Sequence, residues 1–106
     1  MDNKLFNALI DEAEQIDPQN EVLYEENQQK RFDVLANDLT DTIAYLDNCS
    51  KRELDWASES FERLAEHFQS AALSECVKRN IYRFDDPILN EQLKKEYENM
   101  QKISGK

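Results

Sequence analysis

Apolar residues along this chain recur mostly at steps of three and four, the spacing of one face of an α-helix. This spacing predicts helices at about residues 2–16, 19–47, 50–68, 71–83 and 87–103. In the 50–68 helix the apolar stripe consists of Leu54, Ala57, Phe61, Leu64, Ala65 and Phe68. We therefore expect residues 1–106 to form a single all-α domain, a compact bundle of about five helices with the 50–68 helix at its centre.

Residues with strong capping preferences stand at the start of several of these helices. Ser50, followed three residues later by Glu53, has the spacing of a capping box. Asp17 precedes Pro18 and Asp86 precedes Pro87, and each pair is typical of an N-cap followed by a proline at the first helical position. Ser70 is expected to cap the 71–83 helix.

The 19–47 region is longer than most helices of small domains, and its opening is unusual. Residues 19–29 are mostly Glu, Asn and Gln, with one apolar clump at residues 22–24. This composition suits either the exposed opening of one long helix or a short helix and a bend, and we expect a break or bend between Tyr24 and Lys30. Residues 104–106 at the other end of the chain are expected to fray.

Composition supports the helical prediction. Gly105 is the only glycine, and Pro18 and Pro87 are the only prolines, so turns between strands that need a positive φ have almost no suitable residues. Strong helix formers are plentiful instead.

Charge narrows the class of partner. The chain holds 23 acidic and 13 basic residues, a net charge of -10 with a pI near 4.5. Nucleic acid and anionic membrane surfaces are disfavoured as ligands because both require a basic footprint. A basic partner is favoured, although acidity also serves solubility alone. Residues 1–26 hold eight acids and only Lys4, which is not the even distribution expected of a solubility coat.

Residue patterns for catalysis are missing. His67 is the only histidine, and the sequence has no P-loop, dinucleotide fingerprint, nucleophile elbow or calcium loop. Cys49 and Cys76 lie singly, so we expect free thiols that are buried or half-buried. A reducing cytoplasm is the expected compartment, because the sequence shows no signal peptide and no long apolar run. The sequence therefore predicts a protein that is not an enzyme and binds no cofactor or metal.

An interaction surface is the remaining kind of site. The first candidate is the acidic edge, the seven acids of residues 11–26. The second lies on the 50–68 helix and consists of Trp56 and the acidic line, which is Asp55, Glu59, Glu62 and Glu66. Together the candidate partner-binding residues are Asp11, Glu12, Glu14, Asp17, Glu21, Tyr24, Glu25, Glu26, Asp55, Trp56, Glu59, Glu62 and Glu66.

Several of these residues have two interpretations. The acidic line suits either a solvated face partly neutralised by Arg52 and Arg63 or a row of carboxylates for basic side chains. Trp56 is either buried against another helix or an interface anchor, and Tyr24 is either folded back on the bundle or presented with its acidic neighbours. His67 is expected at the surface, with a pH-dependent contact as the alternative.

Residues 54–62, LDWASESFE, followed by FQS at residues 68–70, resemble small helical immunity proteins of bacterial polymorphic-toxin and contact-dependent growth-inhibition systems. The resemblance covers about 20 residues and carries no contact residues onto this chain. It implies a cytosolic protein that binds and blocks the toxic C-terminal domain of a cognate effector, frequently a basic nuclease.

Charge and resemblance together lead to one expectation. We expect an immunity protein that neutralises a cognate basic toxin domain, a nuclease, by occluding its active-site cleft with an acidic surface, and that is a monomer or weak dimer. The alternative is a helical adaptor or regulatory subunit that binds a protein partner through an apolar groove or a dimer face. A stable dimer formed through the Trp56 side would favour the adaptor.

Overall fold

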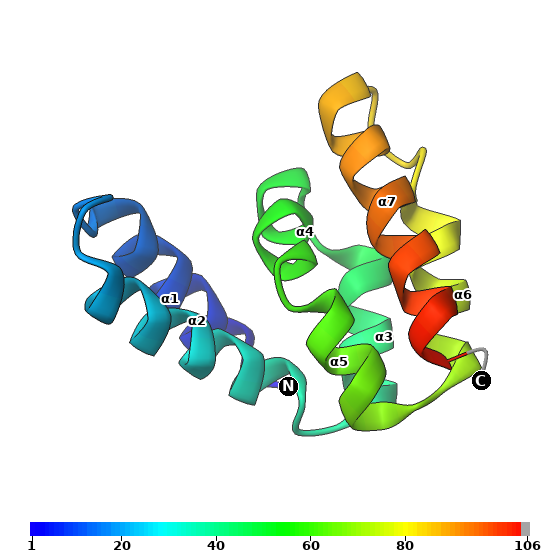
Figure 1. Cartoon of the computed structure of the whole chain (residues 1–106), viewed down its shortest axis with the longest axis horizontal. Coiled ribbons are helices and arrows are strands. Elements are labelled where there is room, and N and C mark those ends of the chain that lie inside the picture. The colour runs from blue at the N-terminus through cyan, green and yellow to red at the C-terminus, as the bar shows by residue number, and fades with distance from the viewer. Residues whose placement is uncertain (105–106) are drawn as a thin grey trace.

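A computed structural model of the chain describes residues 1–104, and within them every regular element is an α-helix (Figure 1). The all-α prediction is confirmed, but these residues form seven helices rather than about five because two predicted helices each divide. The helices are α1 (Asn3–Gln15), α2 (Glu21–Leu35), α3 (Leu39–Asn48), α4 (Lys51–Ser58), α5 (Phe61–Phe68), α6 (Ala71–Asn80) and α7 (Pro87–Ser104). None of them is long and apolar enough to cross a membrane.

The 19–47 region divides after Leu35, so the predicted break between Tyr24 and Lys30 is wrong. Asp38 caps α3 by accepting a hydrogen bond from the Asp41 amide at 3.0 Å. The Thr42 hydroxyl donates to the Leu35 carbonyl at 2.6 Å, which satisfies one of the orphan acceptors at the end of α2. The polar opening of α2 is one continuous helix with an exposed outer face.

The 50–68 region divides at residues 59 and 60, next to Ser58, whose hydroxyl competes with the helical hydrogen bonds. The Ser58 hydroxyl donates to the Asp55 carbonyl and accepts from the Gln92 side chain of α7, both at 2.6 Å. The Ser60 amide then bonds to the Ala57 carbonyl, which makes a tight turn between α4 and α5. The prediction of one helix over residues 50–68 is therefore wrong, although the apolar stripe of this region still packs inside the fold.

Three of the predicted helix N-termini depend on an acidic residue, and two of them are confirmed. Ser50 and Glu53 form the capping box of α4. Asp86 accepts from the amides of residues 88 and 89 and opens α7, with Pro87 at its first position. Asp17 is the exception, because its carboxylate accepts from the Gln19 amide within a turn, and Asn20 caps α2 instead.

Further helix ends fall close to their predicted positions. Ser70 caps α6 as expected, by accepting from the Ala72 amide at 3.1 Å. Helix α6 stops at Asn80, three residues early, because the Asn80 side chain donates to the Cys76 carbonyl and to Asp47 of α3. Ser104 belongs to α7 and is not frayed in the backbone, while residues 105 and 106 lie outside the described residues.

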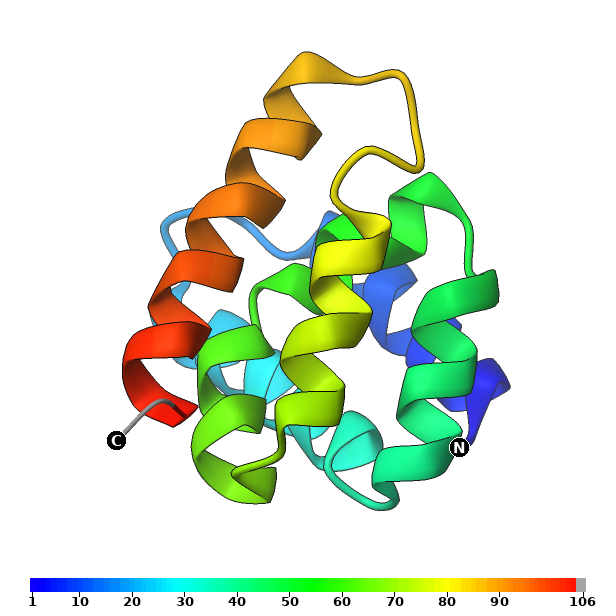
Figure 2. The same cartoon turned by 90° about the vertical axis from the view of Figure 1, so that its right-hand side faces the viewer.

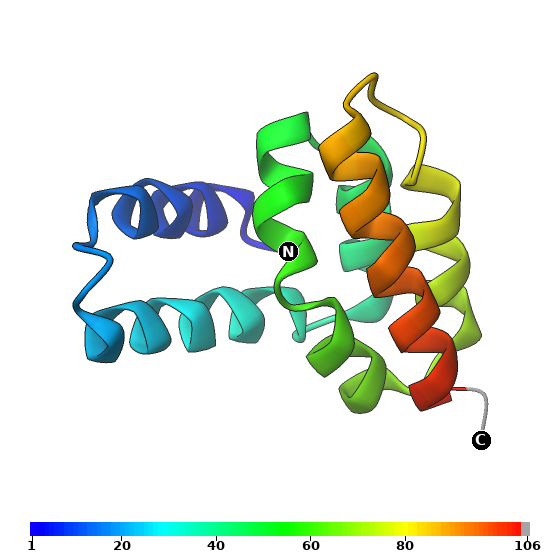
Figure 3. The same ribbon diagram turned by 45° about the horizontal axis from the view of Figure 1, so that its top comes forward.

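The helices are arranged as a two-helix arm and a five-helix body. Helices α1 and α2 pack antiparallel to each other and project from the side of α4 and α5 (Figure 3). Within the body, α6 lies between α3 and α7 (Figure 2). The fold has a radius of gyration of 13.3 Å, close to the ~13 Å of a compact chain of about 100 residues.

The predicted central stripe does lie in the core. Leu54, Ala57, Phe61, Leu64 and Ala65 are buried, and Phe68 packs at the edge of the same cluster. The arm contributes Phe6, Ile10 and Leu35 to this cluster, so it shares the core of the body at its base.

Candidate partner-binding surface

The seven acids of the acidic edge are all exposed and belong to the half of the arm toward its free end. Because α1 and α2 are antiparallel, the last turns of α1 and the first turns of α2 meet there, at the far left of Figure 3. Residues 11–29 contain no Lys or Arg. Two apolar side chains, Val22 and Leu23, are 66% and 47% exposed at the same end. The predicted edge is therefore an exposed acidic region with two exposed apolar side chains at its outer end.

The α1 side of this edge is partly neutralised by Arg52 of α4. The Arg52 guanidinium donates to Asp11 at 2.7 Å and to the two Glu14 oxygens at 2.5 and 3.2 Å. The indole nitrogen of Trp56 also donates to Glu14, at 3.4 Å. Hydrogen bonding to Arg52 lowers the pKa of Glu14. Asp11 and Glu14 thus attach the arm to the body, while Glu12 accepts from the Asn27 side chain at 3.2 Å.

The remaining acids make no ion pair within residues 1–104. Asp17 bonds only to the Gln19 amide of its own turn, and Glu21, Glu25 and Glu26 lie along the exposed face of α2. We call Asp17, Glu21, Glu25 and Glu26 the free tip. The charge of these four carboxylates is therefore uncompensated within the described residues.

Tyr24 is folded back on the body. Its hydroxyl donates to both oxygens of Glu59, at 2.6 and 2.8 Å. Burial and the neighbouring Glu59 carboxylate together raise the pKa of Tyr24. Of the two interpretations open from the sequence, the packed one is the one observed, and Tyr24 joins α2 to the turn that follows α4.

Beneath Tyr24 lies Arg31, a fully buried arginine that sequence reasoning missed. Its Nε donates to Asn27 at 2.7 Å and its Nη1 to Glu59 at 3.1 Å. The guanidinium carbon is 4.9 Å from the centroid of the Trp56 ring and 5.7 Å from that of Tyr24. The helical spacing of Asn27, Arg31 and Leu35, which share one buried face of α2, was the available signal.

Trp56 and Glu59 are therefore parts of the junction between arm and body. Trp56 is half-buried, with its ring against Arg31, so the interpretation as a residue buried against other helices describes most of its surface. Its remaining exposed part lines a shallow pocket of about 260 Å³ with Asp55, Glu59 and Gln92. The Arg31 pair occupies Glu59, which leaves it less available to a partner than its exposure suggests.

The rest of the acidic line follows the bend between α4 and α5 and approaches α7. Burial raises the pKa of Asp55, with Glu59 and Asp86 adding repulsion. Glu62 lies beside Glu96 of α7, and burial together with this neighbouring carboxylate raises the pKa of Glu96 to about 7. Glu66 is exposed one turn beyond Glu62. Glu96 was not among the predicted site residues because its neighbour is distant in sequence.

His67 is exposed at the surface as expected, and its Nε2 lies 3.2 Å from the Ala36 carbonyl. Its ring makes edge contacts with Phe32 and Phe68.

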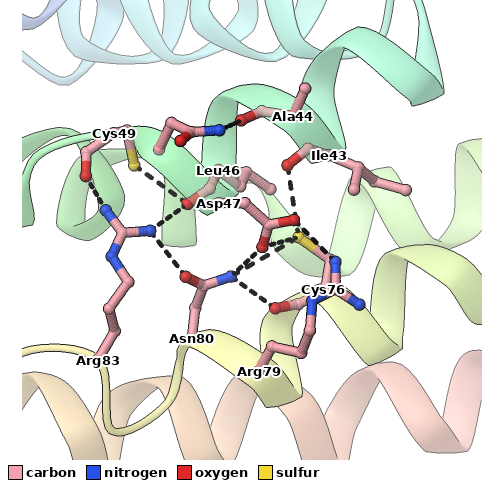
Figure 4. Close-up of polar contacts among 10 residues, drawn as sticks. Ile43, Ala44, Leu46, Asp47, Cys49, Cys76, Arg79, Asn80 and Arg83 are labelled. Atoms are coloured by element: carbon pink, nitrogen blue, oxygen red, sulfur yellow. Dashed lines mark hydrogen bonds and ion pairs between the residues drawn. The ribbon is translucent and has the colours of Figure 1, made fainter.

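The two cysteines belong to a structural polar cluster between α3 and α6 (Figure 4). The Cys76 thiol contacts Asp47 at 3.6 Å, and Asn80 donates to the same carboxylate at 2.8 Å. Arg83 donates to the carbonyls of Leu46 and Cys49 at the end of α3. Burial raises the pKa of Cys49 to about 11 and that of Cys76 to about 12, so both thiols stay protonated at neutral pH.

Among the described residues, no group of three or more His, Cys, Asp and Glu side chains is placed to hold a metal ion. Comparison of the chain with protein-family models, curated proteins and solved structures found no match.

Proposed function

We propose that this protein is an immunity protein that neutralises a cognate basic toxin domain, a nuclease, by covering its active-site cleft with the acidic end of the arm. The observation that carries the proposal is the free tip, four exposed carboxylates without a counter-ion on a segment that lacks any Lys or Arg. A nuclease cleft binds phosphates through basic side chains, and a rigid row of carboxylates can take their place.

The electrostatics of the arm suit rapid association with such a partner. Residues 11–26 hold seven acids and no Lys or Arg, and the free tip lies where α1 and α2 are joined, at the end of the arm farthest from the body, so it meets an approaching protein first. The exposed Val22 and Leu23 lie among these carboxylates and supply apolar area that is buried on contact. The Arg52 and Arg31 pairs hold the arm in a fixed orientation, which limits the entropy lost on binding.

The α5–α7 face supplies a second contact. The repulsion that raises the pKa of Glu96 is relieved when a Lys or Arg side chain approaches Glu62 and Glu96. Asp55 gains in the same way. A basic partner that reaches this face is therefore bound by carboxylates that repel one another in the free protein.

The decisive experiment is co-purification with the C-terminal domain of a secreted effector encoded beside this chain. Its association rate should be high at low salt and should fall as salt rises, because exposed charges are screened. Reversal of the free tip, as Glu21→Lys, Glu25→Lys and Glu26→Lys, should slow association by about tenfold or more.

A matched control changes the net charge equally elsewhere. Glu75→Lys, Asp85→Lys and Glu98→Lys reverse three exposed acids of the body that make no ion pair within the described residues. A slower association in the control than in the free-tip variant would contradict the choice of surface. Inhibition of the effector domain itself is measured separately, by its nuclease activity with and without the protein.

A further inference from the structure

The arm carries a groove between α1 and α2 that no residue of helices α3 to α7 lines. Leu9 is buried at its floor, Val34 is half-buried, and Leu5 is 46% exposed at its edge. The groove has a volume of about 380 Å³, and its surface is mainly apolar. One side of the arm packs on the body, so this groove is a hydrophobic face without a partner in the fold.

The spacing of the lining residues matches the side chains of a third helix. Leu5 and Leu9 are four residues apart on α1, and Lys30 and Val34 are four residues apart on α2, so each pair lies one turn apart along its helix. The lining residues cover positions 2–9 and 30–37, about two turns on each side, so the groove is about 10 Å long and lies toward the base of the arm. An amphipathic helix laid along such a groove inserts its apolar side chains at the same one-turn spacing.

Charge at the rim selects the chemistry of the occupant. Asp2 and Asp33 lie at the groove with a single cation, Lys30. Glu12 and Glu26 continue the same helix faces toward the free tip, and both are exposed. A second copy of this chain, with its own net charge of -10, would bring acidic rims together. The rim therefore favours a helix with Lys or Arg beside its apolar residues.

We propose that the groove between α1 and α2 binds a basic amphipathic helix of the protein partner, with apolar side chains one turn apart on Leu5, Leu9 and Val34 and cationic side chains toward Asp2 and Asp33. This inference rests on the proposed function, since it assigns the apolar part of the same contact. It extends that function by naming the structural element of the partner that the arm recognises.

The probe for this proposal is a dye-labelled synthetic peptide of about four helical turns, with leucines on one face and lysines on the other. A second peptide has the same composition with the leucines dispersed around the helix. The amphipathic peptide should bind at least about tenfold more tightly, by fluorescence anisotropy at physiological salt, since only it buries its leucines in the groove. Equal binding of the two peptides would mean that charge alone attracts them and would overturn the proposal.

Leu5→Asp tests the groove directly, and Ile88→Asp is its matched control. Ile88 is 82% exposed on α7, so both substitutions add one negative charge at an exposed apolar position. Leu5→Asp should weaken peptide binding by about tenfold, whereas Ile88→Asp should leave it within about twofold. Leu5→Ser adds no charge and should also weaken binding. Peptide-induced NMR shifts confined to residues far from Leu5, Leu9 and Val34 in the unsubstituted protein would overturn the proposal without any variant.

The free-tip variant separates this inference from the function on which it rests. If Leu5→Asp and Ile88→Asp bind the peptide equally while reversal of Glu21, Glu25 and Glu26 still slows association with the effector domain, the groove proposal fails and the proposed function stands. If the effector domain neither binds nor is inhibited while the groove still binds the peptide, the proposed function fails. A dimer in sedimentation that Leu5→Asp dissociates would show a second copy as the occupant and would overturn the proposal.

Discussion

Glu96 should destabilise the folded protein at alkaline pH, and Glu96→Gln should remove that effect. Glu96 lies on α7 beside Glu62 of α5, in a half-buried position, and its pKa rises from 4.5 to about 7. A carboxyl whose pKa is raised on folding costs the folded state free energy whenever it must ionise. Relative to its value below pH 4.5, stability is therefore lost as pH rises, and the loss is complete above about pH 7.

The magnitude follows from the shift and from solvent screening. At 1.36 kcal/mol per pKa unit, a rise from 4.5 to about 7 corresponds to about 3 kcal/mol as an upper limit. Glu96 keeps contact with water, which screens its repulsion by Glu62, and this reduces the expected effect to about 1 kcal/mol. Most of it falls between pH 4.5 and about pH 7, the interval between the pKa of Glu96 in the unfolded chain and its pKa in the folded protein.

Urea unfolding monitored by circular dichroism measures the effect. We subtract the free energy of unfolding of the unsubstituted protein from that of Glu96→Gln. This difference should be about 1 kcal/mol larger at pH 8 than at pH 5, because the variant is then the more stable of the two. Glu98→Gln, an exposed position on the same helix, is the control and should show no such change. A difference for Glu96→Gln that is equal at both pH values would refute the reasoning. The carboxyl carbon of Glu96 should also titrate above the ordinary pKa of 4.5 by NMR, and at lower pH in Glu62→Gln.

Three further predictions concern stability. Glu53→Gln should lower the free energy of unfolding by about 1 kcal/mol at pH 7, because hydrogen bonds from Ser50, Tyr45 and Asn7 outweigh burial and lower the pKa of Glu53 to about 2. Measured by urea unfolding, this loss should shrink as the pH falls from 4.5 towards 2. Gln69→Gly should stabilise the protein by about 0.5–1 kcal/mol and so raise its thermal midpoint, because Gln69 has a φ of 47°, a conformation that glycine adopts without strain. An unchanged midpoint would contradict this. Arg31→Ala should lower the free energy of unfolding by about 3 kcal/mol, because it leaves Glu59 without its buried partner. The double variant Arg31→Met with Glu59→Gln should lose less stability than the two single variants together, whereas strict additivity would indicate that the two side chains act independently.

Local sequence signals predicted the elements whose causes are local. The capping box at Ser50 and the N-cap at Asp86 depend on residues within one helical turn, so their spacing alone indicated them. The apolar stripe of residues 54–68 predicted the core because burial follows the helical period. The break between α4 and α5 was missed because a long-range contact contributes to it. Ser58 is held by Gln92 of α7, and a distant residue of this kind leaves no mark in a local pattern.

The candidate surface divides in the same way. Exposure of Glu21, Glu25 and Glu26 followed from the mostly polar composition of residues 19–29, which contain a single apolar clump. The pairing of Glu14 with Arg52 joins residues 38 positions apart, and that of Glu59 with Arg31 joins residues 28 positions apart, so neither was accessible to local reasoning. Glu96 illustrates the same limit, because its pKa shift arises only when α5 and α7 are packed.

The free tip shares no side chain with the hydrophobic core cluster and holds no ion pair within the described residues. Substitutions at Asp17, Glu21, Glu25 and Glu26 therefore leave core packing and the junction of arm and body unchanged. Under the proposed function, mutations can accumulate at these four positions without first requiring compensation elsewhere in the chain. Descendants of one ancestral protein can in this way diverge in the partners they recognise while inheriting the same helical body.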